Sequence, residues 1–371
     1  MTLSSFSNKN LGILPIDPSV VGWERQMSST GGVSAEKNVR WGIVGAGRIA
    51  RRFARSLAHE PHSELVAISC RSAEKAAAFA AAHGVDEEAA LSDDALGGVA
   101  GSAHAALLAR PDVDAVYVAL PHGMHAEWAL AALRAGKAVL CEKPLCVSPE
   151  ETALLARTAR AEGLLLMEGM KTRFLPLYRR VRELVGQGAI GRLTRVEAVL
   201  QNDMGDRIAH GGDYLSAPVG GGMLLDSGIY CAGWIEDYLD GTLEVVSAEA
   251  RWEAGVDCAV DAELRAGERT ACLVTAADRD NTRYARLVGS EGQIVVEQMH
   301  RPERARLERA GEEPVELELP YPVDDLYGEV EHFVELLIAG ETESPVMPLA
   351  ASLRCAELLA AIRGRMGHPK S

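Results

Sequence analysis

Long apolar runs, aromatic side chains and closely spaced cysteines are all scarce in this sequence of 371 residues. No stretch reaches the ~20 apolar residues of a membrane-spanning helix, which argues against a helical membrane protein. Aromatic residues make up only 5% of the chain, a composition more typical of a helix-rich α/β protein than of an all-β sandwich. The seven cysteines form no Cys-x-x-Cys pair, and the ten histidines show no metal-ligand spacing. We therefore expect reduced thiols in a cytoplasmic protein, and no metal site.

Positive charge is also in deficit, because 38 lysines and arginines face 53 aspartates and glutamates, for a formal net charge of −15. This balance repels nucleic-acid phosphates and anionic membrane surfaces, so we expect neither as a partner. The length predicts two domains. Residues 1–38 are polar and rich in glycine and serine, without the apolar segment of a secretory signal, and we interpret them as a disordered N-terminal extension.

From Val39 onwards, short apolar runs alternate with helical segments. This order predicts βαβ units and a parallel sheet, whose buried strands read as unbroken apolar runs. Beyond about residue 170, segments such as Leu193–Gln201 and Glu244–Trp252 alternate apolar and polar residues. That alternation predicts an antiparallel sheet with two different faces. The fold class is therefore α/β, with the change of pattern near residues 145–170.

A glycine-rich turn, Gly45-x-Gly47-x-x-Ala50, lies between the first strand and the first helix. In this context the first glycine permits the tight turn, the second lets the backbone approach a pyrophosphate, and the alanine keeps helix and strand close. The helix N-terminus offers free N–H groups to phosphates, so Arg48 and Ile49 join the predicted cofactor site. The alternative is a tight turn that binds nothing. No Gly-Lys-Ser/Thr follows, which excludes a Walker loop.

The second strand ends in Ser69-Cys70-Arg71-Ser72, without the carboxylate that holds the adenosine ribose of NAD in many folds of this type. A guanidinium is suited to forked contact with a phosphate. We therefore predict that Arg71 and Ser72 bind a 2′-phosphate, with NADP(H) preferred and NAD(H) a possible substitute. The alternative is that Arg71 is a solvated charge at a helix entry.

Glu142-Lys143-Pro144 directly follows the buried strand Ala138–Cys141. Ligands of open parallel sheets bind beyond the carboxyl ends of the strands, so Lys143 is expected where a nicotinamide and its substrate meet. An ammonium there can hydrogen-bond a carbinol or carbonyl oxygen and stabilise its developing negative charge. The alternative is an ordinary solvated lysine.

Three glycines, residues 220–222, lead into a helix on which Asp226 and Tyr230 are four residues apart and share a face. A tyrosine hydroxyl can give a proton to a carbonyl as hydride arrives, or accept one in reverse. We expect Lys143 to lower the pKa of Tyr230 from about 10 by roughly 1–3 units, and Asp226 to orient a substrate hydroxyl. The alternative is an ordinary helix with a surface tyrosine and a capping carboxylate.

In this order, the three elements resemble the glucose–fructose oxidoreductase / inositol dehydrogenase / MocA (Gfo/Idh/MocA) family, over nearly the whole chain from residue 39. The likeness also covers Pro121 with His125, Met167-Glu168 and Arg173-Phe174-Leu175-Pro176. It implies a Rossmann domain over residues 39–157, then an α/β substrate-binding and oligomerisation domain over 158–371 with an open, mostly antiparallel sheet. It identifies Lys143 as the catalytic lysine and Asp226 as the substrate-orienting aspartate. The cofactor site then also includes Leu120, Pro121, His122, His125, Glu142 and Lys143.

Tyr230 stands where many members have histidine, and this variant is similar to the dihydrodiol and NADP-xylose dehydrogenase branch. Two residues depart from that branch: Lys171 replaces a bulky apolar or aromatic residue, and His122 replaces an asparagine common in relatives. The resemblance implies hydride transfer at a carbinol or carbonyl carbon of a sugar, inositol, anhydrosugar or vicinal diol. It also implies a homodimer or homotetramer formed through the C-terminal sheet, and Arg173 and His210 are further candidate substrate-binding residues.

Two other functions stay open at this point. A non-catalytic NAD(P)-binding sensor can share the fold, but it does not need the lysine, aspartate and tyrosine together. A methyltransferase can use a glycine-rich turn for a nucleoside, yet methyl transfer gives no role to Lys143, Asp226 and Tyr230. The presence of all three favours an oxidoreductase.

Overall fold

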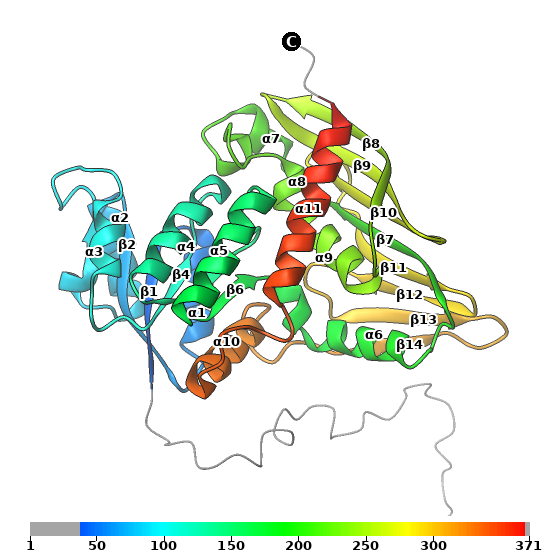
Figure 1. Cartoon of the computed structure of the whole chain (residues 1–371), viewed down its shortest axis with the longest axis horizontal. Coiled ribbons are helices and arrows are strands. Elements are labelled where there is room, and N and C mark those ends of the chain that lie inside the picture. The colour runs from blue at the N-terminus through cyan, green and yellow to red at the C-terminus, as the bar shows by residue number, and fades with distance from the viewer. Residues whose placement is uncertain (1–37, 368–371) are drawn as a thin grey trace, which may run out of the picture.

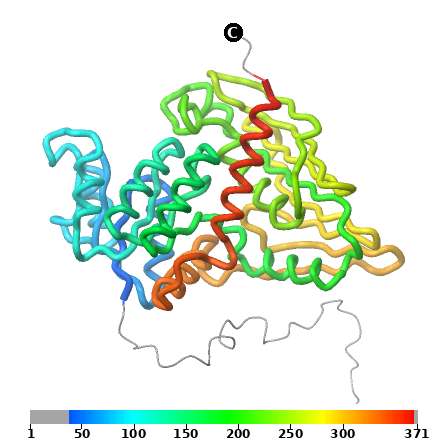
Figure 2. The backbone as a smooth tube through the Cα atoms, viewed as in Figure 1, coloured from blue at the N-terminus to red at the C-terminus, as the bar shows by residue number. Residues whose placement is uncertain are grey.

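The computed structural model describes residues 38–367. Apart from Asn38, the predicted disordered extension over residues 1–38 lies outside the described residues. Figures 1 and 2 show two halves side by side, with the first strands in blue and the strands of the second sheet in colours from green through yellow to orange. The last helix, α11 (Leu349–Met366), runs between them and contacts both α5 (Pro149–Glu162) and α9 (Gly228–Tyr238) (Figure 1).

The first half is built on a six-stranded sheet in the order β3-β2-β1-β4-β5-β6, and all its strand pairs are parallel. The prediction of a parallel sheet is thus confirmed. The order reverses between β1 and β4, and ligands of such sheets bind beyond the carboxyl ends at that point. The last strand of this sheet, β6, lies beyond residue 157, the expected end of the first domain. The strands are β1 (Val39–Val44), β2 (Ser63–Cys70), β3 (Ala90–Ser92), β4 (Ala115–Val118), β5 (Ala138–Glu142) and β6 (Leu166–Gly169).

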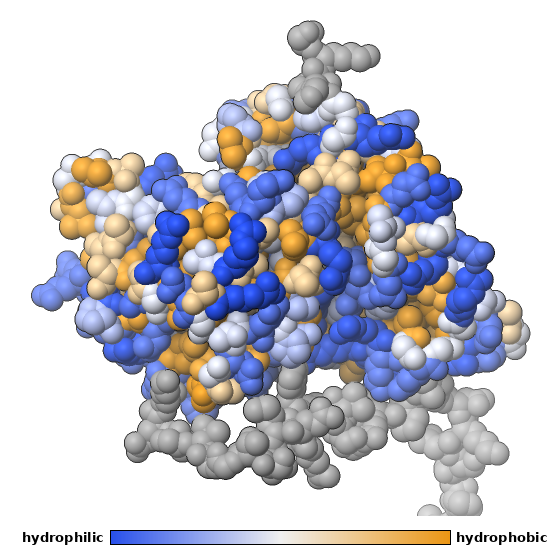
Figure 3. All heavy atoms as spheres, viewed as in Figure 1, coloured by the Kyte–Doolittle hydropathy of each residue, from blue (hydrophilic) through white to orange (hydrophobic). Residues whose placement is uncertain are grey.

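Helices connect these strands and pack on the sheet. α4 and α5 lie side by side in Figure 1 and contact each other. On the face of the molecule that Figure 3 shows, strongly hydrophilic residues alternate with apolar ones. Within residues 38–367, no helix is both long and apolar enough to cross a bilayer. The connecting helices are α1 (Arg48–Leu57), α2 (Ala73–His83), η3 (Glu87–Ala89), α3 (Ser102–Leu108), η4 (His122–Met124) and α4 (His125–Arg134).

A group of fully buried aromatic rings holds α1 on the sheet. Phe53 of α1 stacks on Tyr117 of β4 with ring centroids 3.7 Å apart, and it meets Trp41 of β1 edge-on at 5.3 Å. Trp41 also contacts Phe333, at 5.1 Å, on α10 (Tyr327–Ala339). A helix from near the end of the chain therefore completes the core of the first half. This packing fixes where the N-terminus of α1 points.

The second half is built on an eight-stranded sheet in the order β14-β13-β12-β11-β7-β10-β9-β8, in which only the β7–β10 pair is parallel. The predicted open, mostly antiparallel sheet is confirmed. α9 packs on β7 and β10 and so covers one face. The strands are β7 (Leu193–Gln201), β8 (Glu244–Glu253), β9 (Val256–Ala266), β10 (Arg269–Ala276), β11 (Arg283–Gly289), β12 (Gly292–Glu297), β13 (Arg304–Arg309) and β14 (Val315–Glu318).

Further helical segments lie in the chain on either side of β7, between β6 and α9. They carry several of the candidate residues, and the expected single helix of Asp226 and Tyr230 is in fact broken at Ser227. These segments are η5 (Lys171–Phe174), α6 (Pro176–Gly186), α7 (Gly205–Ala209), η6 (Tyr214–Ser216) and α8 (Met223–Asp226).

Candidate active site

The three predicted catalytic residues meet at the carboxyl end of β5. The Nζ of Lys143 donates to the backbone oxygen of Asp226 at 2.8 Å and to its Oδ1 at 3.2 Å. The same Nζ lies 4.9 Å from the ring centroid of Tyr230. Lys143 follows the first sheet, whereas Asp226 and Tyr230 lie on α8 and α9 of the second half. The two halves thus form one group of catalytic candidates.

The glycines of residues 220–222 place Asp226. Gly222 has φ +92°, and a Cβ there would lie 2.2 Å from Oδ1 of Asp257, so only glycine fits. Asp257 in turn accepts a hydrogen bond from the backbone N–H of Leu224 at 2.6 Å, which anchors the start of α8 on β9. The carbonyl of Gly220 lies 2.7 Å from Nδ1 of His122 on the first half. These contacts hold the loop and α8 in register with Lys143.

Asp226 is an ionised carboxylate in this setting. Burial alone would raise its pKa, but the charge of Lys143 and further hydrogen bonds lower the pKa to about 2. One of these bonds comes from the hydroxyl of Tyr214, which donates to Oδ1 of Asp226 at 2.9 Å. Tyr214 is a site residue that sequence reasoning missed, since it stands in η6 outside any motif. Its position in the loop that precedes the glycines was the one available signal.

Tyr230 differs from expectation in its ionisation. Burial raises the pKa of Tyr230 well above 10, and the charges of Glu142 and Asp226 raise it further. The predicted lowering of this pKa by Lys143 is therefore wrong. The reason is that the phenol is buried among carboxylates, and the Lys143 ammonium that lies over the ring is already paired with Asp226. Tyr230 is protonated in the folded protein at neutral pH.

The glycine-rich turn fits a dinucleotide. Gly45 has φ +106°, and a Cβ there would lie 2.4 Å from the backbone oxygen of Ala119, so the turn requires glycine. A Cβ on Gly47 would meet no atom within 4 Å, which leaves open space in front of this backbone. Gly47 is the N-cap of α1, no side chain caps this end, and no acidic residue lies in the first turn, where Arg48 and Ile49 are placed. The open space at Gly47 and the uncapped helix end without acidic residues suit a bound pyrophosphate.

The remaining residues of the predicted cofactor site follow the neighbouring strands. Arg71 is exposed at the end of β2, while the Oγ of Ser72 accepts a hydrogen bond from the backbone N–H of Lys75 at 3.3 Å and so caps α2. Leu120 and Pro121 follow β4, and the side chain of Leu120 lies beside Gly45. All four follow the carboxyl ends of strands of this sheet, and their contacts with the cofactor stay predictions.

His122, His125 and Glu142 are buried, and their side chains bind other parts of the protein. The ring of His125 lies between two backbone oxygens, 2.8 Å from that of Pro144 and 2.8 Å from that of Leu120. Glu142 accepts a short hydrogen bond from the hydroxyl of Tyr117. These side chains hold the loops around Lys143, and direct contact with the cofactor stays a prediction for them.

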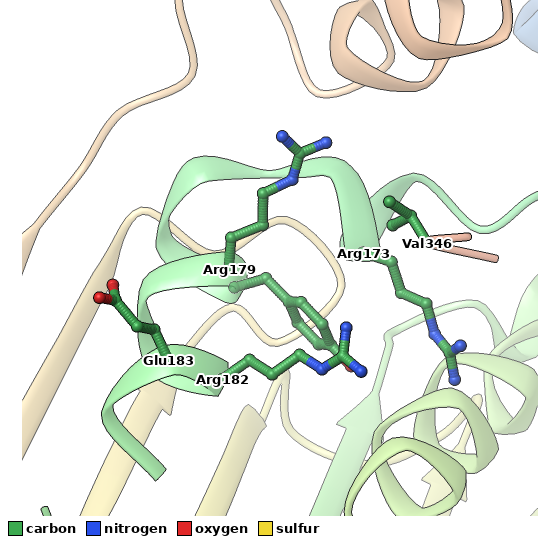
Figure 4. A pocket seen from close by; sticks show the side chains of 6 residues that line it. Arg173, Arg179, Arg182, Glu183 and Val346 are labelled. Carbon is green, nitrogen blue, oxygen red and sulfur yellow. The ribbon is translucent and has the colours of Figure 1, made fainter. Parts of the chain in front are cut away.

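Arg173 and His210 are not brought together with Lys143. The buried Arg173 forms an ion pair with Glu236 and donates to the backbone oxygen of Gly233 at 3.1 Å. It borders a pocket of about 340 Å³ on the side of α6 (Figure 4), lined also by Tyr178, Arg179, Arg182, Glu183 and Val346. His210 is exposed at the end of α7, with its Nδ1 2.7 Å from the backbone oxygen of Asp206. Substrate binding by either residue stays a prediction.

Comparison with known proteins agrees with this geometry. Residues 39–170 match the model described as "Oxidoreductase family, NAD-binding Rossmann fold", and residues 178–295 match the "GFO/IDH/MocA C-terminal domain". A mouse trans-1,2-dihydrobenzene-1,2-diol dehydrogenase is 33% identical over 348 residues, covering 89% of this chain and 97% of the relative. The chain belongs to the Gfo/Idh/MocA oxidoreductase family.

Two further known proteins are similar to this chain over nearly their whole length. The scyllo-inositol 2-dehydrogenase (NADP(+)) IolU of Bacillus subtilis is 30% identical over 342 residues, covering 89% of this chain and 97% of the relative. The crystal structure of KijD10, a 3-ketoreductase from Actinomadura kijaniata in complex with NADP and TDP-benzene, superposes with a TM-score of 0.76 at 31% identity. That match covers 89% of this chain and 98% of KijD10.

We predict that Arg173→Met lowers stability, because the buried guanidinium is paired with Glu236. Removing one partner of a buried ion pair costs about 3–5 kcal/mol, because the other charge stays buried, although Arg354 also pairs with Glu236 here and reduces the loss. Chemical denaturation measures the free energy of unfolding, with Arg182→Met, whose side chain is 55% exposed, as the matched control from the same pocket. A raised substrate KM with unchanged stability would instead assign Arg173 to the substrate.

Proposed function

We propose that this protein is an NADP(H)-dependent oxidoreductase acting on small polyhydroxy compounds: sugars, inositols, anhydrosugars or vicinal diols. It transfers a hydride to or from the carbon that bears the reacting oxygen. The observation that carries this proposal is the meeting of Lys143 with Asp226 and Tyr230 at the carboxyl end of β5. This is the place where a dinucleotide bound at the Gly45 turn would present its nicotinamide.

The cofactor supplies or accepts the hydride when it is bound, and the protein provides its binding site. The N-terminus of α1 and the backbone at Gly47 would hold the pyrophosphate, and Arg71 would meet the 2′-phosphate. The name of IolU specifies NADP(+), and KijD10 was crystallised with NADP, which supports the preference for the phosphorylated cofactor.

The reacting oxygen of the substrate lies between Lys143 and the hydroxyl of Tyr230. Lys143 donates a hydrogen bond to this oxygen and stabilises its negative charge as hydride transfer proceeds. Tyr230 is protonated in the resting state, so it acts as the proton donor for reduction and receives the proton in oxidation. The ionised Asp226, steadied by Tyr214, accepts a hydrogen bond from a neighbouring substrate hydroxyl.

The same residues disfavour the alternative functions. A ligand sensor of this fold has no use for a lysine and a tyrosine arranged around one reacting oxygen. Methyl transfer leaves Lys143, Asp226 and Tyr230 without a role.

All cysteines of the described residues are free and buried, which supports the proposal of a reducing, cytoplasmic location.

We predict that Lys143→Ala lowers turnover roughly 100- to 1,000-fold while the Kd for NADPH changes little, because the lost hydrogen bond is made in the transition state. The assay follows NADP reduction at ~340 nm against a panel of sugars, inositols and diols, and NADPH fluorescence gives the Kd. Lys137→Ala is the matched control, since this buried lysine donates to backbone oxygens of Arg110 and Val113 away from the site. Turnover that survives Lys143→Ala would disprove the assigned role.

We predict that Arg71→Ala weakens NADPH binding by about tenfold or more and leaves NADH binding unchanged, since a charge-assisted hydrogen bond contributes about 1.5–3 kcal/mol. Fluorescence titrations with both cofactors measure this difference. Arg110→Ala is the control, because Arg110 pairs with Asp112 before β4, at the opposite edge of the sheet. Equal losses for NADPH and NADH would show that Arg71 does not read the 2′-phosphate.

We also propose that the eight-stranded sheet forms the interface of a homodimer or homotetramer. On the face opposite α9, the side chains of Val274, Val288 and Val295 stay partly exposed in the single chain, beside an ion pair between Arg286 and Glu197. Light scattering should give two or four times the chain mass of 39.6 kDa. Val295→Glu should reduce that mass by placing an unpaired charge in the interface, and a monomeric wild-type protein would refute the assembly.

A further inference from the structure

A carboxyl group without a partner lies behind the proposed active site. Glu329 is in the first turn of α10 and is 1% exposed, and neither of its carboxyl oxygens has a hydrogen-bond partner among the described residues. The start of the helix does not serve it, because the N–H groups of Leu326 and Tyr327 both donate to Asp324. Buried polar groups of folded proteins are nearly always hydrogen-bonded, so this exception needs an explanation.

Glu329 shares its surroundings with Glu142. Gly169 pairs with Glu142 in the parallel β5–β6 ladder. A Cβ on Gly169 would lie 3.6 Å from the Cα of Glu142 and 3.7 Å from Oε2 of Glu329, so both acids border this glycine. Glu142 already has two donors, the hydroxyl of Tyr117 and the backbone N–H of Lys143 at 3.2 Å. Glu329, in contrast, has no donor in the described part of the chain that would stabilise a carboxylate.

The nearby cations are already paired with other carboxylates. Lys171 donates to Oδ2 of Asp325 at 2.5 Å, and Arg52 binds the other oxygen of Asp325. Lys143 is paired with Asp226. Burial raises the pKa of Glu329 well above its usual range, the charge of Glu142 raises it further, and Lys171 opposes this only in part. The titratable groups that face Glu329 are Tyr117, Glu142, Lys171, Tyr230, Asp324 and Asp325.

We propose that Glu329 holds a proton in the folded enzyme and acts as a positioning residue for Tyr230. The inference rests on the proposed function, in which Tyr230 gives its proton to the substrate oxygen as hydride arrives from NADPH. The phenolate that remains is buried beside Glu142 and Asp226, and a protonated Glu329 adds no further negative charge. Loss of the proton from Glu329 opposes formation of the phenolate. Glu329 therefore sets an upper pH limit for reduction.

The test uses Glu329→Gln, which keeps the shape of a protonated carboxyl but cannot ionise. Infrared spectroscopy of the substrate-free protein at mildly alkaline pH should show a protonated-carboxyl band that this variant lacks. The alkaline limb of the kcat profile for carbonyl reduction should move up by about one pH unit or more. A merely structural role would change stability and leave that limb in place. Glu335→Gln, an exposed acid on the same helix, should alter neither measurement.

Absence of the band in the wild-type protein would overturn the proposal, and an unchanged alkaline limb would overturn the role towards Tyr230. Should Glu329→Gln not fold, Glu142→Gln replaces it: loss of the neighbouring charge should make the Glu329 band disappear at a lower pH than in the wild type, and an unshifted band would refute the pairing. Failure of every substrate in the panel would refute the proposed function instead, and the infrared result would still decide the protonation of Glu329.

Discussion

The contact between Lys143 and Asp226 is the interaction on which the arrangement of the site depends. It joins the carboxyl end of a parallel strand in one half to a short helix in the other, and it places the ammonium over the ring of Tyr230. Both side chains are nearly buried, so their attraction is only weakly screened by solvent. The start of α8 is fixed by Asp257 and by the close approach that Gly222 permits. Backbone packing thus prepares the pair before any ligand binds.

Burial and nearby charges shift the pKa values of the neighbouring groups in opposite directions. Asp226 is kept ionised by Lys143 and by Tyr214, whereas Tyr230 keeps its proton because burial and nearby carboxylates outweigh the cations. Two groups with opposite protonation states therefore lie around one proposed reacting oxygen. That separation of states is what a site needs in order to hold a hydroxyl with one group and transfer a proton with another.

Long-range packing connects the site to the rest of the chain. α10 contributes Phe333 to the aromatic core under α1, and its first turn carries Glu329, whose carboxyl borders Gly169 next to Glu142. Asp325, just before this helix, binds Arg52 of α1 and Lys171 of η5. Helix α1, whose N-terminus is the proposed pyrophosphate site, is thereby linked to Lys171, whose Nζ lies 5.9 Å from the ring centroid of Tyr230. Lys171, which stands where the dihydrodiol dehydrogenase branch has a bulky apolar or aromatic residue, is part of this ion-pair network.

The sequence alone predicted the parallel and antiparallel sheets and the glycine-rich turn, because strand patterns and turn geometry depend on neighbours along the chain. It also singled out Lys143, Asp226 and Tyr230 as catalytic candidates. Only the tertiary structure decided that Tyr230 holds its proton tightly, that Tyr214 supports Asp226, that Arg173 pairs with Glu236, and that Glu329 is buried without a partner. Each of these properties depends on burial and on charges brought in from distant segments. Spacing along the chain carries no record of either.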